Sequence, residues 1–195
     1  MPTPFLSDWH RAIGLELATL SWNVVGCVVL VLSAVAASSV ALIAFGFDSL
    51  LEIGASTVVL WELQDRSAAR RATAIRLIGG AFAVLTVYLL AHSLMALADG
   101  HRADTSPIGL AWTAATAVVM FALATGKRRV GQRLGNPVVI AEARVTVADG
   151  ALATAVVTGL ILDAAADVWW ADPAVGLVVA AYAAHEAHDL LTAEH

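Results

Sequence analysis

The sequence predicts an all-α integral membrane protein, a single domain folded as a bundle of six transmembrane helices. Two observations carry this prediction. The 195 residues are 59% hydrophobic and only 14% charged, whereas a soluble domain is about a quarter charged. The apolar residues also fall into runs long enough to cross a hydrocarbon core about 30 Å thick. With one cysteine and a net charge of −5, the chain resembles neither a disulfide scaffold nor a nucleic-acid-binding protein.

The first two spans come from one charge-free stretch between Leu17 and Phe47. As a single straight helix this stretch would be about 46 Å long, which is too long for one crossing of the membrane. We therefore expect two spans, at about 12–35 and 39–63, joined by a turn in the small residues 36–39.

Charged or proline-containing connections separate the four remaining spans. Pro107 precedes the fourth span, and Pro137 and Pro173 open the fifth and the sixth, since proline suits the first turn of a helix. The third span ends where charged residues resume. The expected ranges of these spans are about 72–98, 108–126, 138–162 and 173–191.

The basic residues are divided unevenly between the two ends of the predicted bundle. Ten of the eleven lie on the side of the termini and the even-numbered connections, and only Arg102 lies on the other side. Because lysine and arginine accumulate in cytoplasmic loops, we expect both termini in the cytoplasm and the protein in the inner or plasma membrane. The ten residues are Arg11, Arg66, Arg70, Arg71, Arg76, Lys127, Arg128, Arg129, Arg133 and Arg144.

Three acidic residues stand at depths where a membrane helix normally has none. Asp48 lies about ten residues from either end of its span, Glu52 follows one turn later on the same face, and Asp149 lies about twelve residues into the fifth span. An ionised side chain near the midplane costs about 2.5 kcal/mol or more, so such residues usually mark an ion or proton path. No basic residue is expected at this depth. The alternative is that the carboxyls are neutral, or paired with Arg144, and serve packing.

Residues 46–52, Gly-Phe-Asp-Ser-Leu-Leu-Glu, resemble the second-helix signature of the cation diffusion facilitator (cation efflux) family. Trp22-Asn23 and residues 169–173 resemble a short branch of that family with the transmembrane domain only. The resemblance implies six spans, exchange of cytoplasmic divalent metal for protons, and usually a homodimer. Asp48, Glu52 and Asp149 would then form the metal site. The metal ion would be a transported substrate, with no permanently bound cofactor.

One ligand of the family's site is missing from this chain. The family places two ligands four residues apart on the fifth span, and the matching positions here are Val145 and Asp149. Glu142 lies on the face of Asp149 but about 10.5 Å away along the axis, so it suits an entry or proton-relay carboxyl better than a shared ligand. The candidates for a further ligand or relay are Glu142, Thr146, Asn23 and Glu16. The alternatives are an interhelical hydrogen bond for Asn23 and, for Glu16, a helix-end glutamate that reaches to the interface.

The histidines are weaker candidates for metal ligands. His92 lies about twenty residues into the third span, where it would be an exit-side ligand. His185, His188 and Asp189 gather at the end of the sixth span. A metal-collecting patch there competes with a simple solvated helix end.

Proton-coupled export of a divalent metal is the function that these residues favour. Ionised carboxylates bind metal and protonated ones do not, so one site can alternate between metal and proton. Oxygen ligands favour Mn²⁺ or Fe²⁺, whereas the family resemblance favours Zn²⁺, Co²⁺ or Cd²⁺. The alternatives are a membrane metal-binding or accessory protein that does not transport, and a proton-driven exporter of organic cations. No enzyme motif lies in the spans, so we expect no enzymatic activity and no nucleic-acid partner.

A homodimer would be held together by the membrane helices. We expect no cytoplasmic domain after the last span, where only a few residues remain, and helices in lipid associate through close packing of small residues. Gly79 and Gly80 make the third span the expected interface, unless these glycines pack within one subunit.

Overall fold

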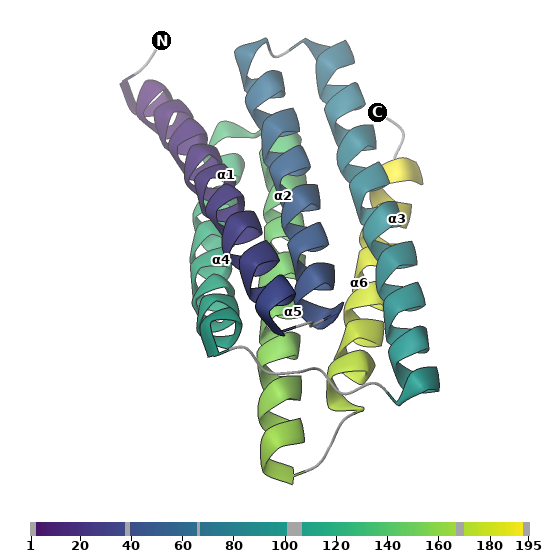
Figure 1. Cartoon of the computed structure of the whole chain (residues 1–195). Helices are drawn as coiled ribbons and strands as arrows, with labels where there is room; N and C mark the ends of the chain where they lie inside the picture. The colour runs from purple at the N-terminus through teal and green to yellow at the C-terminus, as the bar shows by residue number, and fades with distance from the viewer. Residues whose placement is uncertain (1–2, 38–39, 66, 101–106, 167–169, 193–195) are drawn as a thin grey trace.

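The computed structural model describes residues 3–37, 40–65, 67–100, 107–166 and 170–192. Within these residues it contains six α-helices and no strand (Figure 1), which confirms the all-helical prediction. The helices are α1 (Thr3–Ala37), α2 (Val40–Gln64), α3 (Ala68–Asp99), α4 (Pro107–Leu134), α5 (Pro137–Ala166) and α6 (Ala171–Thr192). Four features of the sequence prediction lie outside the described residues: the centre of the first turn at 38–39, Arg66, Arg102 and Trp169.

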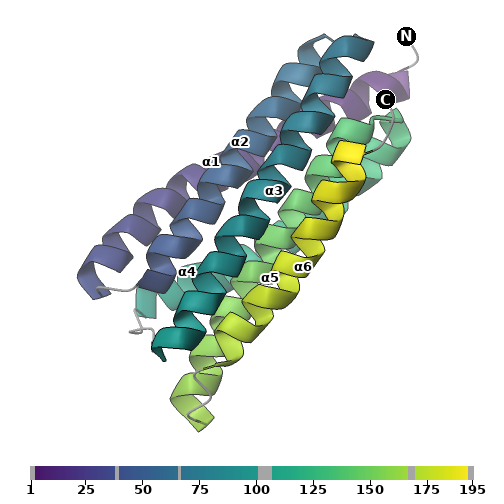
Figure 2. The ribbon, with the colours of Figure 1, turned by 90° about the vertical axis from the view of Figure 1, so that its right-hand side faces the viewer.

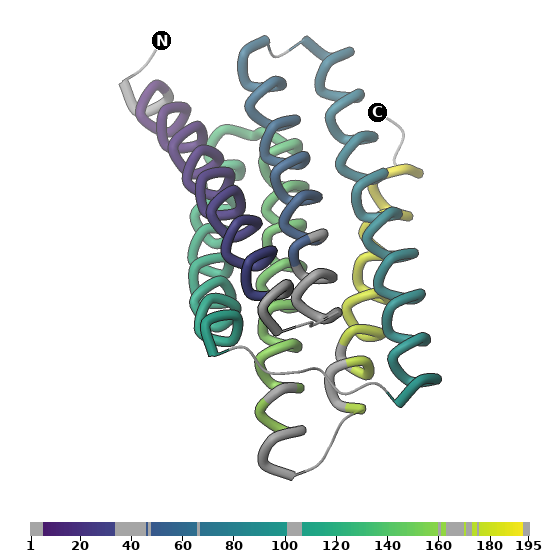
Figure 3. Tube along the Cα trace, viewed as in Figure 1, coloured from purple at the N-terminus to yellow at the C-terminus, as the bar shows by residue number. Residues whose placement is uncertain are grey.

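The helices form two packed groups. Helix α1 packs against α2 and α4, α4 packs against α5, and α2 packs against α5, so these four helices surround one interior. Helices α3 and α6 lie side by side as an antiparallel pair next to α5 (Figure 2). The start of α1 and the end of α6 lie at the same end of the bundle, as the Cα trace shows (Figure 3). We call this end the basic end, because each one of the ten basic residues that the structure describes lies in the half of its helix nearest to this end.

The outer surface of the bundle is apolar. In the described part of the chain, three helical segments are long and apolar enough to cross a membrane by length and composition: Leu6–Ser33, Ala68–Asp99 and Pro107–Leu134. Large apolar side chains on these segments face outward, with Val31, Val87 and Val118 between 58% and 72% exposed. An apolar surface of this extent is suited to contact with lipid.

Helices α1 and α4 extend furthest beyond the predicted spans. Helix α1 begins at Thr3 rather than near residue 12, and α4 ends at Leu134 rather than at 126. Hydropathy marks where the lipid-facing apolar segment stops, whereas the hydrogen-bonded helix continues through charged turns. Gly135 follows α4 with a φ of 59°, a left-handed conformation that glycine adopts without strain and that commonly ends a helix.

The two glycines of the expected dimer interface have different surroundings. A Cβ atom at Gly79 would lie 3.0 Å from Leu191 and 3.2 Å from Leu190 of α6, so Gly79 serves the close packing of α3 against α6 within one chain. A Cβ at Gly80 would meet nothing within 4 Å. The inclusion of Gly79 in a dimer interface is therefore wrong, and Gly80 remains open to a partner.

Candidate cation-binding site

Two polar helix faces meet inside the four-helix group formed by α1, α2, α4 and α5. Polar residues recur every three or four positions on α2 and on α5, which places each set on one face of its helix, and the two helices pack against each other. We call this contact the seam. It consists of six side chains that are at most 3% exposed: Asp48, Glu52 and Ser56 on α2, and Glu142, Thr146 and Asp149 on α5.

Asp48 and Asp149 form an acidic pair in the seam. Their carboxyl groups interact directly with each other. Among the described residues, neither oxygen of Asp149 nor the Oδ2 atom of Asp48 has a hydrogen-bond partner. Ionised carboxylates only accept hydrogen bonds, and burial of unpaired charges is strongly unfavourable. The pair therefore requires a shared proton or a cation.

Glu52 lies one turn along α2 from Asp48. The Thr146 hydroxyl donates a hydrogen bond of 2.5 Å to the Oε1 atom of Glu52, while the Oε2 atom has no hydrogen-bond partner in the described part of the chain. Glu52 also interacts electrostatically with both members of the acidic pair. It is thus next to the pair, with one oxygen uncommitted.

The three predicted metal ligands are close neighbours but are not gathered into a ready-made metal cage. In the described residues, no group of three or more His, Cys, Asp or Glu side chains is arranged to hold a metal ion. Instead, the carboxylates of Asp48 and Asp149 face each other, and the carboxylate of Glu52 is hydrogen-bonded to Thr146.

Lys127 of α4 enters the seam beside these carboxylates. Its side chain is fully buried, and its Nζ atom lies 2.5 Å from Glu142 Oε1 and 3.1 Å from Glu16 Oε2. The same ammonium donates a hydrogen bond of 3.2 Å to the Thr146 hydroxyl and lies 3.9 Å from Glu52 Oε1. One buried cation therefore contacts three carboxylates and the hydroxyl that holds Glu52.

The sequence prediction was wrong about Lys127. It placed this lysine in a cytoplasmic connection and expected no basic residue at the depth of the acids. Because α4 continues to Leu134, Lys127 lies within the helix and on its inner face. A signal was available in the sequence: Lys127 continues a row of buried α4 residues that includes Met120 and Ala124 at helical spacing.

Glu16 and Glu142 are both held by this lysine. The interpretation of Glu16 as a helix-end glutamate reaching to the interface is wrong, since its side chain is fully buried and paired with Lys127. Glu142 also accepts a hydrogen bond of 3.0 Å from the Ser56 hydroxyl. Both glutamates thus belong to the Lys127 cluster rather than to the acidic pair.

Asn23 of α1 is buried but is not bonded across helices through its amide nitrogen. Its Nδ2 atom donates to the backbone oxygen of Thr19 at 3.1 Å, within the same helix. Its Oδ1 atom has no hydrogen-bond partner among the described residues. The amide nitrogen of Asn23 therefore does not make the interhelical hydrogen bond that the sequence suggested as an alternative.

A second set of polar contacts lies nearer the basic end, beyond the seam. Asn136 accepts a hydrogen bond of 2.9 Å from the backbone nitrogen of Val138, which caps the start of α5. Its Nδ2 atom donates to Glu62 Oε2 at 2.8 Å, and Arg71 lies 3.5 Å from the other oxygen of Glu62. These contacts join the end of α2 to the starts of α3 and α5.

The remaining candidate ligands lie outside the seam. His92 is on α3, with its ring 5.9 Å from that of Tyr88. His185 and Asp189 form an exposed pair 3.6 Å apart on α6, and His188 is exposed. Arg144 pairs at 2.6 Å with Glu186 of α6, so it does not neutralise the acidic pair.

Comparison with known families gives one match, over nearly the whole chain. The family model described as the cation efflux transmembrane domain matches residues 17–193. Comparison with curated proteins gives no match.

Proposed function

The chain belongs to the cation efflux family, whose transmembrane-domain model covers residues 17–193, and we propose that it exchanges divalent metal cations for protons at the Asp48–Asp149 pair. Members of this family are transporters rather than enzymes, and the protein is a membrane-embedded cation transporter of this kind. The proposal adds the cargo, the coupling to protons and the residues that bind both.

The acidic pair is the observation that carries the proposal. Two facing, buried carboxylates, three of whose oxygens have no hydrogen-bond partner among the described residues, need positive charge between them. Protons and divalent cations both supply it, and they compete for the same oxygens. A divalent ion that replaces two protons leaves the net charge of the pair unchanged. The pair can therefore be buried in either state at a similar free-energy cost.

Glu52 is the third metal ligand in this proposal. Its Oε2 atom has no hydrogen-bond partner in the part of the chain that the structure describes, and its Oε1 atom accepts a hydrogen bond from Thr146. When a metal enters between Asp48 and Asp149, rotation of Glu52 away from the threonine brings a third carboxylate to the ion. In the proton-loaded state, the hydrogen bond from Thr146 thus holds the Glu52 carboxylate in place.

Lys127 is an internal counter-charge in this proposal. It neutralises part of the Glu16 and Glu142 charge at 3.1 Å and 2.5 Å. The cluster around it is already supplied with a cation, whereas the acidic pair is not. An incoming metal ion is therefore drawn to Asp48 and Asp149 rather than to Glu16 and Glu142.

We propose further that the direction is export from the cytoplasm, with the basic end of the bundle facing the cytoplasm, and that the transporter works as a homodimer. The uneven distribution of basic residues supports this orientation. The carboxylate ligands favour Mn²⁺ or Fe²⁺, and family membership favours Zn²⁺, Co²⁺ or Cd²⁺. The cation panel below decides between these two groups.

The test is metal-dependent proton flux in proteoliposomes, measured with Zn²⁺, Co²⁺, Cd²⁺, Mn²⁺ and Fe²⁺. Asp48→Asn and Asp149→Asn are expected to abolish flux, because each removes one of the two opposed carboxylates. Glu52→Gln is expected to reduce it strongly. Asp189→Asn is the matched control, since it makes the same chemical change at an exposed helix end.

Metal-driven proton flux that survives in both Asp48→Asn and Asp149→Asn would refute the proposed site. Metal binding without flux in the wild-type protein would identify a metal-binding or accessory protein instead. Proton flux driven only by organic cations would identify an organic-cation exporter.

A further inference from the structure

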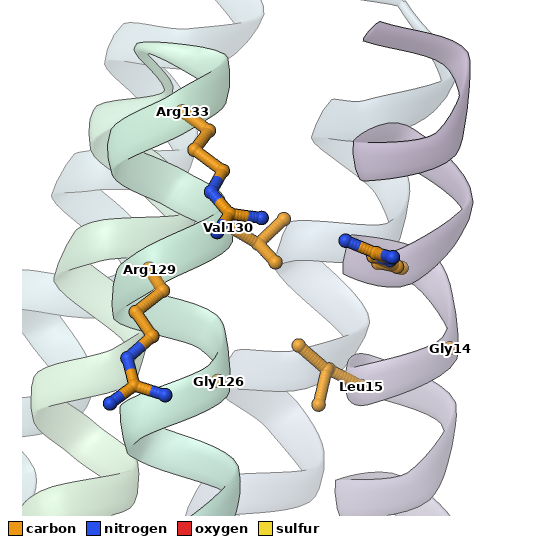
Figure 4. A pocket seen from close by; sticks show the side chains of 7 residues that line it. Gly14, Leu15, Gly126, Arg129, Val130 and Arg133 are labelled. Atoms are coloured by element: carbon orange, nitrogen blue, oxygen red, sulfur yellow. The ribbon is translucent and has the colours of Figure 1, made fainter. Parts of the chain in front are cut away.

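A basic groove lies on the outer surface between α1 and α4, towards the basic end of the bundle (Figure 4). It is lined by three arginines, Arg11 of α1 and Arg129 and Arg133 of α4. Its volume is about 480 Å³, within the range of roughly 300–1,000 Å³ that is usual for small-ligand sites. It is separate from the seam, whose side chains are buried inside the bundle.

The positive charge of the groove is only partly balanced. Asp8 lies 3.5 Å from both Arg11 and Arg133, and these long contacts involve arginine side chains that are 62% and 57% exposed. In the described part of the chain, Arg129 makes no ion pair with an acidic side chain. Asp8 therefore pairs with two of the three guanidinium groups, and the groove keeps a net positive charge that is suited to an anion.

The walls of the groove indicate which kind of anion it takes. Between the arginines, Leu15 and Val130 line the groove with apolar atoms, and Gly14 leaves open space, since a Cβ there would meet nothing within 4 Å. Both helices also carry exposed apolar side chains, among them Leu17 of α1 and Val118 of α4. A ligand with an anionic head and an apolar tail would match both parts of the groove.

We propose that this groove binds an anionic phospholipid, with the lipid phosphate held by Arg129 and Arg133 and an acyl chain lying along Leu15 and Val130. Guanidinium groups bind phosphate oxygens through paired, charge-assisted hydrogen bonds. Basic pockets between membrane helices are suited to anionic lipid headgroups at the leaflet where basic residues gather. Because the lipid spans the α1–α4 contact, its binding holds together the two helices that supply Glu16 and Lys127.

The experiment is native mass spectrometry of the purified protein, titrated with phosphatidylglycerol, with phosphatidylcholine and with inorganic phosphate. Phosphatidylglycerol is expected to bind about tenfold more tightly than phosphatidylcholine, because only its headgroup keeps a net negative charge for the arginines. Arg129→Gln should weaken phosphatidylglycerol binding by about tenfold. The matched control is Arg128→Gln, which removes the same charge from an exposed neighbour that does not line the groove.

Gly14→Leu separates the groove from simple charge attraction. This substitution removes no charge, is accommodated without a clash at its Cβ, and places a side chain where the acyl chain would lie. It should weaken phosphatidylglycerol binding clearly more than Arg128→Gln does. Equal weakening in Arg128→Gln and Arg129→Gln, no effect of Gly14→Leu, or displacement of the lipid by an equal concentration of inorganic phosphate would each overturn the proposal.

Discussion

Replacing Lys127 with methionine should destabilise the protein in a pH-dependent manner. The substitution keeps the length and the apolar stem of the side chain but removes the ammonium group. Glu16 and Glu142, both fully buried, would then have no cation beside them. The free energy of unfolding should fall, and the fall should grow as the pH is raised.

The size of the effect follows from the burial of all the partners. Removing one member of a buried ion pair typically costs about 3–5 kcal/mol, because the other charge is left uncompensated. Protonation of the stranded carboxyls limits this loss. The folded variant would then hold more protons than its unfolded state, so its stability should decrease as pH rises. The loss should lie near the upper end of the range at pH 8 and be clearly smaller at pH 5.5.

Chemical unfolding in detergent micelles at both pH values measures this effect. Lys127→Arg is the charge-preserving control, and the double variant Lys127→Met with Glu142→Gln removes the nearest stranded carboxylate. We expect the double variant to recover a substantial part of the stability lost at pH 8. A loss below about 1 kcal/mol at pH 8, or an equal loss at both pH values, would refute the role of Lys127 as a buried counter-charge.

Three further predictions test other parts of the structure. Metal affinity should fall by up to about tenfold per pH unit for each proton displaced, since only ionised carboxylates bind metal; calorimetry between pH 5.5 and 8 checks this, and a constant affinity would contradict exchange at a shared site. Asn136→Ala should lower the free energy of unfolding by about 1–3 kcal/mol, because it removes the α5 cap and strands the buried Glu62; an unchanged stability would show that this contact is dispensable. Gly80→Leu should weaken a dimer without altering metal affinity, because Gly80 opens outward; single-molecule photobleaching in bilayers measures this, and an unchanged monomer–dimer equilibrium would place the interface elsewhere.

Much of the fold could be predicted from the sequence, because membrane helices must satisfy their own backbone hydrogen bonds and present apolar side chains to lipid. The charge-free stretch from Leu17 to Phe47 predicted two helices, and the structure has two there. The helix ends were less predictable. Hydropathy records the apolar segment, whereas α1 and α4 continue into charged turns at the basic end.

The sequence predicted only those site residues that are unusual for a membrane helix. Asp48 and Asp149 stood out because charges are rare at that depth, and the structure brings their carboxyls together. Lys127 was missed because it immediately precedes Arg128 and Arg129, so it was assigned to the same charged end. Which of these three basic residues turns inward depends on the rotation of α4 against α1 and α5, and charge counting carries no information about that rotation.

The central claim is that a metal ion and protons compete for the Asp48–Asp149 pair, and locating the metal tests it most directly. Anomalous X-ray scattering from crystals of the Mn²⁺-loaded protein, or the Zn²⁺-loaded protein if zinc is the cargo, gives the position of the ion. We predict a peak between Asp48 and Asp149 at pH 8, within bonding distance of Glu52, that disappears at pH 5.5. A peak beside Glu142 or at His185 and Asp189 instead, or a peak at the acidic pair that is unchanged at pH 5.5, would contradict the account.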